Sequence, residues 1–479
     1  MYKIRTKLAA AIQPLSKQYK FQIFNVLTIR NVSALHITGD KASENYVTIQ
    51  PFLDFKGTFD HAESVESSIM KRRMQMDMGQ VRAMYDNYKK AILQIEKVDK
   101  ERDDIAKQLK EMSKVKSVND SAINQLKEQG KTLRNNMKAM KTELYPIEDE
   151  FIQAFLNLPN MLHPQCPDGD YERLLYRSKQ QVMQRPTISS HLDFENLIRF
   201  IDNSRYYLMN EAAEFDLHCT DALTKYFLEQ GKFMQTCNPD FVRCVLLEAN
   251  ATPLTCYHKV MEQQLQNQLN CAYLTGGGAF ESFLGAVTKL VVYPSVVPLK
   301  YICSGRLYEK SNEEVKPSLY TATQTNAVQT FVATLNAQQS EEQMDAILNM
   351  CLDFYKSFEN LNFRIVYVKA SDLTAAESLR AQVEVYSQSE RRYVCVGRVS
   401  NYTDYVSKRI LFTMREQKEY KFLHLVGGPI LYTSRLIAAL IESGEALDCR
   451  KVQKTLQLNE TFCKDSSNKP IEDFKSLFK

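Results

Sequence analysis

The sequence lacks the features that mark membrane-spanning and metal-binding proteins. No stretch of about 18 uncharged apolar residues occurs, because the best candidate, residues 425–441, is interrupted by Arg435, so no membrane insertion is expected. The eleven cysteines contain no C-x-x-C pair, and the seven histidines do not cluster with them. Scattered buried thiols in a reducing compartment fit this pattern better than a zinc site or a disulfide framework.

Common catalytic signatures are also missing. The chain has no G-x-x-x-x-G-K-S/T phosphate loop, no G-x-S-x-G nucleophile motif and no H-E-x-x-H zinc motif, which argues against the enzyme classes that depend on them. A run of three glycines at 276–278 is interpreted as a turn before a helix rather than as a phosphate-binding loop.

What is present is the composition of a soluble multidomain protein. The 479 residues and 55.3 kDa suggest two or three domains. Apolar residues make up 44% and charged residues 25% of the chain, which is normal for a globular protein with a sizeable core.

Positive charge is concentrated in the first third of the chain. Residues 1–39 contain six basic residues and no acidic one, and residues 62–145 contain eighteen basic and thirteen acidic residues. The overall charge is only +4, so the long C-terminal part is mildly acidic. Any nucleic-acid surface is therefore expected near the front of the chain.

The start of the chain has the pattern of a targeting segment. Basic residues alternate with apolar ones over the first 30 positions, without a single acid, which is typical of a mitochondrial presequence. A basic first helix of the folded domain is the alternative. We predict a presequence and linker at residues 1–45, cleavage near residues 30–45, and residence in the mitochondrial matrix.

A long helical hairpin is predicted next. From Met84, apolar residues recur at alternating steps of four and three up to Met112, with Arg102 as the only polar member of the series, which is a coiled-coil seam. The pattern breaks over residues 113–121 and resumes from Leu126 to Leu144. Two such helices joined by a short turn pack antiparallel. The first, expected over residues 66–113, would be roughly 70 Å long.

The second helix of this arm carries a basic stripe. Five residues follow the seam by one position at steps of four and three: Lys127, Lys131, Arg134, Lys138 and Lys141. They line one face of the helix without an intervening acid, and such a face suits a phosphate backbone. The alternative is a solvated face that keeps the coiled coil soluble.

Several short motifs after the arm resemble the seryl-tRNA synthetase family. They follow the family's order: LNLPN at 156–160, HP at 163–164, PDG at 167–169, NSRYYL at 203–208, the class II motif 1 region at 231–239, SNYTDY at 400–405 with KR at 408–409, and HLVGG at 424–428 with Arg435 eight residues on. The resemblance covers about nine-tenths of the chain. It implies an α+β fold, in which the antiparallel helical arm is joined to a mostly antiparallel sheet domain flanked by helices.

The family's amino-acid and motif 2 positions are altered. By the resemblance, the family's T-x-E matches Thr275 to Gly277, so glycine replaces the acid that pairs with the substrate ammonium. Arg306 matches the motif 2 arginine, but Tyr308 stands where an acid is expected. Glu309 is one residue further along, and we expect it to point to the opposite face of the strand.

The metal-binding and motif 3 positions are altered as well. Gln329 and Cys395 replace two more acids, and Arg398 stands where a small residue lines the serine pocket. Gly427 begins a motif 3 that has lost its usual sequence, although Arg435 is retained. Arg306 and Arg435 could still attract an anion, or they could form salt bridges within the sheet domain. Without the four acids, productive binding of ATP and magnesium is not expected, and no cofactor is predicted.

Within the family the chain resembles a group of insect mitochondrial paralogues that keep the scaffold without the catalytic residues. The resemblance implies a non-enzymatic protein that binds serine tRNA through an N-terminal domain at residues 46–160. It also implies pairing, through the motif 1 region of a degenerate synthetase-like domain at 161–479, with mitochondrial seryl-tRNA synthetase or with a second copy. Two alternatives remain: a divergent but active synthetase, and a scaffold whose arm binds protein.

Overall fold

The computed structural model describes residues 33–39, 49–112, 120–178, 190–202, 205–260, 271–310 and 316–457. Most of the expected presequence and linker lies outside the described residues, as does most of the expected turn of the arm. Residues 34–479 belong to one compact unit.

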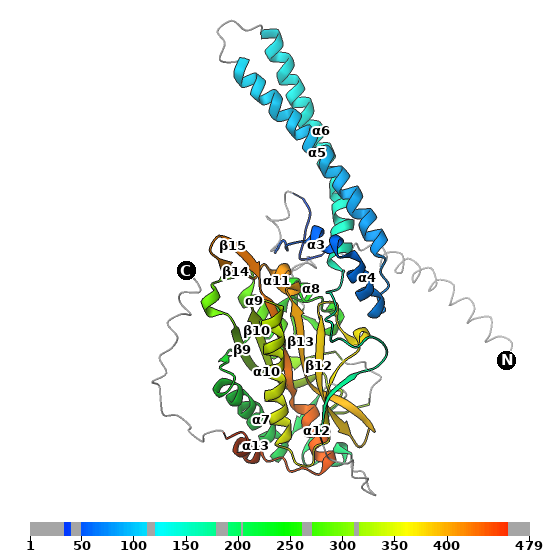
Figure 1. Ribbon diagram of the computed structural model, residues 1–479. Helices are drawn as coiled ribbons and strands as arrows, with labels where there is room; N and C mark the ends of the chain where they lie inside the picture. Colours follow the sequence, from blue (N-terminus) through cyan, green and yellow to red (C-terminus); the bar gives the residue numbers. More distant parts are fainter. Residues whose placement is uncertain are drawn as a thin grey trace, which may run out of the picture. The chain divides into compact units, whose positions relative to one another are not determined.

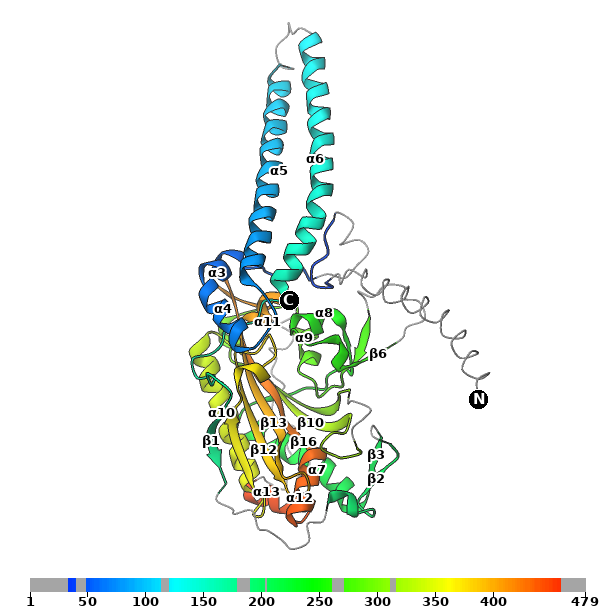
Figure 2. The same cartoon turned by 90° about the vertical axis from the view of Figure 1, so that its right-hand side faces the viewer.

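The N-terminal part of this unit is a helical hairpin on a small helical base. The base contains α3 (Phe55–Asp60) and α4 (Ala62–Lys71), and the hairpin consists of α5 (Met78–Met112) and α6 (Asp120–Leu156) (Figures 1 and 2). The prediction of one helix over 66–113 was wrong. The chain leaves the helix after α4 because Arg73 has a φ of 58°, in the left-handed region that does not continue a right-handed helix. The 35 residues of α5 correspond to about 52 Å rather than 70 Å.

The predicted seam of the hairpin is confirmed. All nine positions from Met84 to Met112 and all six from Leu126 to Leu144 are half-buried, while most of the positions between them are exposed. Gly130 lies opposite Ile105 in the seam, and a Cβ there would make an ordinary contact at 3.8 Å. Arg102, the polar exception, turns its guanidinium toward Asp99 and Asp103 at 2.8 Å each. The periodicity alone therefore identified the packed faces.

The C-terminal part is built on an eight-stranded sheet in which only the β4–β9 pair is parallel. In spatial order its strands are β1 (Arg173–Arg177), β11 (Phe363–Tyr367), β12 (Leu379–Ser387), β13 (Arg392–Thr403), β16 (His424–Tyr432), β10 (Gln324–Thr334), β9 (Leu299–Tyr308) and β4 (Met234–Gln235). The expected α+β class with a mostly antiparallel sheet is confirmed.

Helices cover both faces of this sheet. One face, called the α7 face, packs against α7 (Asn210–Glu229), α10 (Ala337–Lys356), α12 (Thr433–Ser443) and α13 (Cys449–Thr455). The other, called the α9 face, packs against α8 (Cys244–Ala249), α9 (Glu281–Val287) and α11 (Tyr405–Ile410). Successive residues of β9 alternate between the two cores, with Ile302 on the α7 face and Cys303 on the α9 face, as strand geometry requires.

Three small sheets surround the main one. They comprise β2 (Ile198–Phe200) with β3 (Tyr206–Leu208); β5 (Phe241–Arg243), β7 (Ala272–Leu274) and β6 (His258–Val260); and β15 (Glu419–Phe422), β14 (Thr413–Glu416) and β8 (Val291–Val292). Within the described residues no helix is long and apolar enough to cross a membrane, and the ten described cysteines are free thiols.

Candidate functional site

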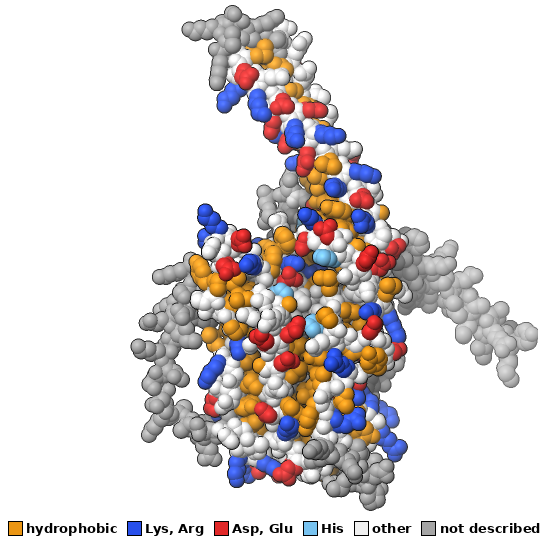
Figure 3. Space-filling view, viewed as in Figure 1, with side chains coloured by type: hydrophobic (Ala, Val, Ile, Leu, Met, Phe, Trp, Pro, Cys, Tyr) orange, Lys and Arg blue, Asp and Glu red, His pale blue; other side chains and the backbone are white. Residues whose placement is uncertain are grey.

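The five stripe residues all lie on α6 and are all exposed. Lys131 Nζ lies 4.0 Å from the Glu128 carboxylate, and the two side chains are 70% and 76% exposed. Such a pair is screened by water and leaves the ammonium available. The face of the arm seen in Figure 3 carries acidic as well as basic side chains, so the stripe is a local feature of α6 rather than part of a uniformly basic arm.

A group of charged and aromatic side chains occupies the α9 face at the centre of the sheet. Arg435, in the first turn of α12, donates to the Cys395 carbonyl at 3.1 Å and lies 3.7 Å from the Glu309 carboxylate. Its guanidinium also stands over the Tyr432 ring, at 4.3 Å. Burial raises the pKa of the Cys395 thiol, although Arg435 and Arg398 oppose this effect. Three positions matched to the family's active site, those of Cys395, Arg398 and Arg435, therefore lie together.

A β-bulge brings two of these residues to the same face. Cys395 and Arg398 are three residues apart and would point to opposite faces of a regular strand. The register of β12 with β13 shifts between Val383 and Glu384, which inserts one extra residue in β13. Arg398 consequently shares the α9 face with Cys395, where Tyr432, Glu309 and Glu377 raise its pKa against the effect of desolvation.

Arg306 does not belong to this group. It is exposed, and its charge lowers the pKa of Tyr206 and Asp216, two groups on the α7 side whose pKa burial raises. Asp216 belongs to α7 and accepts a hydrogen bond from Asn326, the residue paired with Arg306 across β9 and β10. Arg306 and Arg435 therefore lie on opposite faces of the sheet and cannot hold one anion between them.

Glu309 points to the face of the sheet opposite to that of Tyr308. This is the face on which Arg435 lies and on which Leu307 packs beside Tyr432. Glu309 stands just after the end of β9, and its N–H donates to the Thr323 carbonyl at 2.7 Å. This hydrogen bond extends the pairing of β9 with β10 by one residue and fixes the Glu309 backbone where the strand ends. The acid that lies beside Arg435 is thus Glu309, which shares the face of Leu307 rather than that of Arg306 and Tyr308.

The glycines after β7 pack too closely for any larger residue. Thr275 is fully buried, and its carbonyl accepts the Tyr308 N–H at 3.0 Å. A Cβ on Gly277 would lie 2.8 Å from the Asn238 carbonyl oxygen, and one on Gly276 would lie 2.0 Å from that of Arg306. The segment is a turn leading to α9, as predicted, and its backbone leaves no space for the acid that the family motif carries here.

Gln329 and Gly427 lie where β10 and β16 cross the centre of the sheet. Gln329 is fully buried in β10; its amide donates to the Thr330 carbonyl, but its Oε1 has no hydrogen-bond partner among the described residues. A Cβ on Gly427 would lie 2.2 Å from the Thr330 carbonyl oxygen of the paired strand. The close pairing of β10 and β16 therefore requires glycine at this position. An acid at position 329 would be fully buried, at a high energetic cost unless a cation paired with it.

The described residues do not fit a magnesium ion. No group of three or more His, Cys, Asp or Glu among them could hold a metal. The Glu281 carboxylate accepts hydrogen bonds from Asn250 and Thr252 at 3.0 and 2.6 Å, and Glu309 faces Arg435. These acids already have partners within the protein, and Arg398 adds a cation near Glu309.

Sequence reasoning missed a buried ion pair on this face. Glu377 lies on the α9 face with Arg380, whose Nε donates to it at 2.9 Å, and Ser400 Oγ donates to the same carboxylate at 2.6 Å. Burial by itself raises the pKa of Glu377, but Arg380 and Ser400 outweigh it and hold the pKa at about 2. The motifs quoted for the resemblance do not include Glu377 or Arg380, so only their isolated charges in an apolar segment could have drawn attention to them.

A second missed group lies between the α7 face and the end of α12. His191 Nδ1 lies 2.8 Å from Glu442 Oε1, and His191 Nε2 lies 3.4 Å from Ser318 Oγ. Although this resembles a Ser-His-Glu arrangement, Nε2 also accepts the Leu319 N–H at 3.3 Å, and all three side chains are buried. A general base needs a free lone pair within reach of a substrate, so the group is structural.

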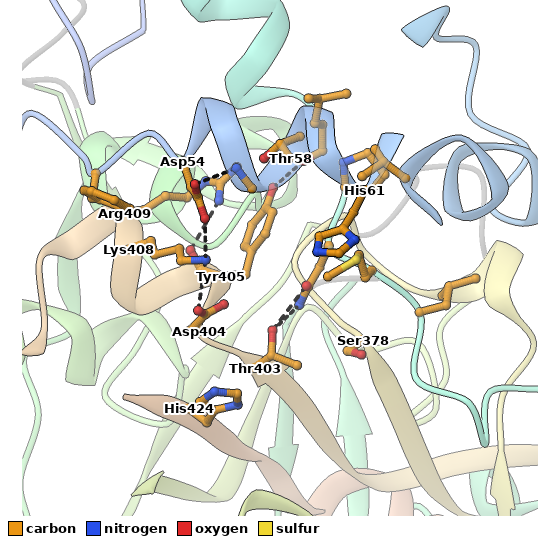
Figure 4. Close-up of a pocket in the computed structure, with 18 of the residues that line it drawn as sticks. Asp54, Thr58, His61, Ser378, Thr403, Asp404, Tyr405, Lys408, Arg409 and His424 are labelled. Carbon is orange, nitrogen blue, oxygen red and sulfur yellow. Dashed lines mark hydrogen bonds and ion pairs between the residues drawn. The ribbon is translucent and has the colours of Figure 1, made fainter. Parts of the chain in front are cut away.

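A cavity of about 540 Å³ lies between the helical base of the arm and the sheet domain (Figure 4). In Figure 4, His61 from the base and His424 from β16 approach it from opposite sides. Lys408 stands at its edge between Asp404 and Asp54, at 2.9 and 3.6 Å. None of the nine site positions matched above lines this cavity, although residues of the motifs at 400–405, 408–409 and 424–428 do. The cavity is therefore separate from the charged group around Arg435.

Comparison with known proteins identifies similar chains. The model of the seryl-tRNA synthetase N-terminal domain matches residues 52–162. The serine–tRNA synthetase-like protein Slimp of Drosophila melanogaster is 53% identical over 94% of this chain and 96% of its own length. The mitochondrial serine–tRNA ligase of Mus musculus is 22% identical over 85% of this chain and 82% of its own. A crystal structure of seryl-tRNA synthetase from Pyrococcus horikoshii, complexed with ATP, superposes with a TM-score of 0.72 at 17% identity, covering 85% of this chain and 98% of that one.

Proposed function

The chain belongs to the seryl-tRNA synthetase family, and we propose that it is a catalytically inactive member that binds tRNA, chiefly serine tRNA, through its α5–α6 arm. The observation that carries this proposal is the row of five exposed cations on one face of α6. Contacts with phosphates and with the shape of the RNA require no reading of base edges, and a rigid coiled coil presents such cations at a regular spacing.

The absence of catalysis is the second part of the proposal. The supporting observations are Gly277, which has no space for an acid, and Gln329 and Cys395 at two further acid positions. Stabilising charge that develops in a transition state requires preorganised groups of the correct sign. On the α9 face the chain instead pairs its own acids with its own arginines.

We further propose residence in the mitochondrial matrix and pairing through residues 231–239, with mitochondrial seryl-tRNA synthetase or with a second copy. The helix-to-strand form of this region, α7 followed by β4, supports the pairing, because β4 lies at an edge of the main sheet. Leu217 on α7 is 66% exposed and would be covered in a dimer. The proposed domains are residues 46–160 and 161–479, following the presequence and linker.

Charge reversal on the arm tests the proposed tRNA binding. Lys131→Glu, Arg134→Glu and Lys138→Glu together should abolish binding of serine tRNA in a filter or mobility-shift titration. The matched control reverses Lys90, Lys97 and Lys100, exposed residues of α5, and changes the net charge equally. Circular dichroism should show an intact coiled coil in both variants, since neither changes the seam.

The salt dependence separates the outcomes. The parent and the control should lose tRNA affinity steeply as the salt concentration rises. In the stripe variant, each phosphate contact removed should lower the slope of log affinity against log salt concentration by about 1. If the stripe variant binds tRNA as tightly as the control at every salt concentration, the stripe is a solvated face and the arm is left as a protein-binding element.

A further inference from the structure

Arg72, at the end of α4, is a buried cation held by backbone carbonyls. The residue is 5% exposed, and its guanidinium donates to the carbonyls of Thr374 and Asn160 at 2.6 and 3.1 Å, and also to that of Glu377. Its Nε donates to Ser68 Oγ at 3.1 Å within α4. A single guanidinium thus joins the base of the arm to a loop of the sheet domain.

The loop whose carbonyls accept hydrogen bonds from Arg72, residues 374–377, is shaped by the Glu377 side chain. The Thr374 N–H donates to Glu377 Oε2 at 2.7 Å, and the Glu377 N–H donates to the Thr374 carbonyl at 3.2 Å. These bonds close a tight turn in which the Thr374 and Glu377 carbonyls both face Arg72. The same carboxylate is anchored on the sheet by Arg380 and Ser400.

The neighbouring links on this side of the junction lie at the surface. Lys71 pairs with Asp168 at 3.2 Å and Arg73 with Asp170 at 2.6 Å, between side chains that are all more than 40% exposed, and such pairs contribute little. The cavity of about 540 Å³ lies between the same base and the sheet domain. Arg72 is therefore the buried polar link from α4 to the sheet domain.

The segment that follows α6 makes further bonds to the sheet domain besides the one from Arg72 to the Asn160 carbonyl. The Asn160 amide donates to the Ala376 and Tyr402 carbonyls at 2.9 and 2.8 Å, and the Tyr405 hydroxyl donates to the Leu158 carbonyl at 3.0 Å. The chain that follows α6 is thus fixed to the sheet domain, and α4 is fixed through Arg72, which bonds both that chain, at Asn160, and the sheet domain. The direction of the arm depends on both attachments, because the two helices pack along their whole seam.

We propose that Arg72, which is hydrogen-bonded to the turn closed by Glu377, is a positioning residue for the arm. Through this contact the α9 face of the sheet fixes the direction in which the arm is held for RNA binding. The inference rests on the proposed function for its consequence in RNA binding, but the geometry of the arm tests it independently. It also gives the Glu377–Arg380 pair a role: Arg380 balances the carboxylate that closes the turn.

The test uses the full chain with donor and acceptor dyes on non-canonical residues at position 128 on α6 and position 229 at the end of α7. Arg72→Gln should broaden the distance distribution between the dyes and weaken serine tRNA binding about two- to thirty-fold, the range of couplings that packed networks carry. Arg73→Gln is the matched control, since Arg73 is a neighbouring arginine whose pair with Asp170 lies at the surface, with side chains 66% and 58% exposed.

A second variant covers the case in which Arg72→Gln does not fold. Arg72→Lys keeps the charge but cannot reach three carbonyls with one planar fork, and it should produce the same broadening to a smaller extent. If either folded variant has the distance distribution and affinity of Arg73→Gln, the positioning role is wrong. If Arg72→Gln broadens the distance distribution but the triple charge reversal of the stripe leaves tRNA binding unchanged, the positioning role of Arg72 is supported. In that case the proposed RNA-binding function is wrong.

Discussion

The Arg435 guanidinium lies 3.7 Å from the Glu309 carboxylate, on the face of the sheet opposite to Arg306. Arg435, which the resemblance matches to the motif 3 arginine, therefore lies beside an acid of the chain itself. An anionic substrate would have to displace Glu309 to use this cation, at the cost of an unpaired carboxylate in a partly buried site.

We expect no serine-dependent ATP–pyrophosphate exchange and no serylation of tRNA by the purified protein. The physical reason is the loss of charged contacts worth about 2 kcal/mol each, which together lower the rate by several orders of magnitude even if they do not add fully. An active mitochondrial seryl-tRNA synthetase is the positive control. Exchange clearly above background that disappears in Arg435→Ala would show an active enzyme.

Restoring one acid should not restore activity. Gly277→Glu places a Cβ 2.8 Å from the Asn238 carbonyl oxygen, so the turn must shift, and we expect a loss of stability of about 1–3 kcal/mol. Urea unfolding of the variant and the parent measures this difference. A Gly277→Glu variant as stable as the parent would indicate that the turn adapts easily.

The His191–Glu442 pair should make the protein sensitive to acid. Burial tends to raise the pKa of Glu442, but hydrogen bonds from His191, Ser389 and Ser387 outweigh it and lower the pKa to about 2. Because the folded-state pKa is below the unfolded value, this stabilisation is complete above about pH 4.5 and is lost as the pH falls toward 2. It amounts to about 3 kcal/mol.

Glu442→Gln should therefore lower the free energy of unfolding by about 2–3 kcal/mol at pH 7, with a smaller difference from the parent at pH 3. Denaturant unfolding at the two pH values measures this. Glu359→Gln is the control, since Glu359 is 74% exposed in its pair with Lys451 and should change stability little. Equal effects of Glu442→Gln at both pH values would exclude titration of this carboxylate as the cause.

Residues 1–45 should direct a fluorescent reporter to mitochondria, because the segment is basic, and its first 39 residues contain no acid. Replacing Lys3, Arg5 and Lys7 with Gln should reduce import. Cytosolic fluorescence of the unmodified fusion would favour a basic first helix of the folded domain instead.

The protein should sediment as a dimer, alone or with mitochondrial seryl-tRNA synthetase. Cys237→Glu places a charge at an exposed position within residues 231–239, and we expect it to shift the protein toward monomer, because burying an unpaired charge in an interface is costly. A parent protein that remains monomeric under both conditions would rule out pairing through this region.

The sequence by itself determined the arm and its exposed stripe. The seam from Met84 to Met112 depends on the 3.6-residue period of the helix, a local property that side-chain spacing records directly. The fold of the sheet domain was implied by the resemblance of its short motifs to the seryl-tRNA synthetase family, and the glycine turn before α9 followed from its composition.

Only the tertiary structure decided which charged groups meet. The break after α4 coincides with Arg72, whose acceptors lie up to 305 residues away. The bulge in β13 places Arg398 on the α9 face, and the last residues of β9 place Glu309 on the same face. Such register changes arise from pairing between distant strands. His191 and Glu442 are 251 residues apart. Because these contacts depend on how the strands pair and how the two parts of the chain dock, no local pattern in the sequence could reveal them.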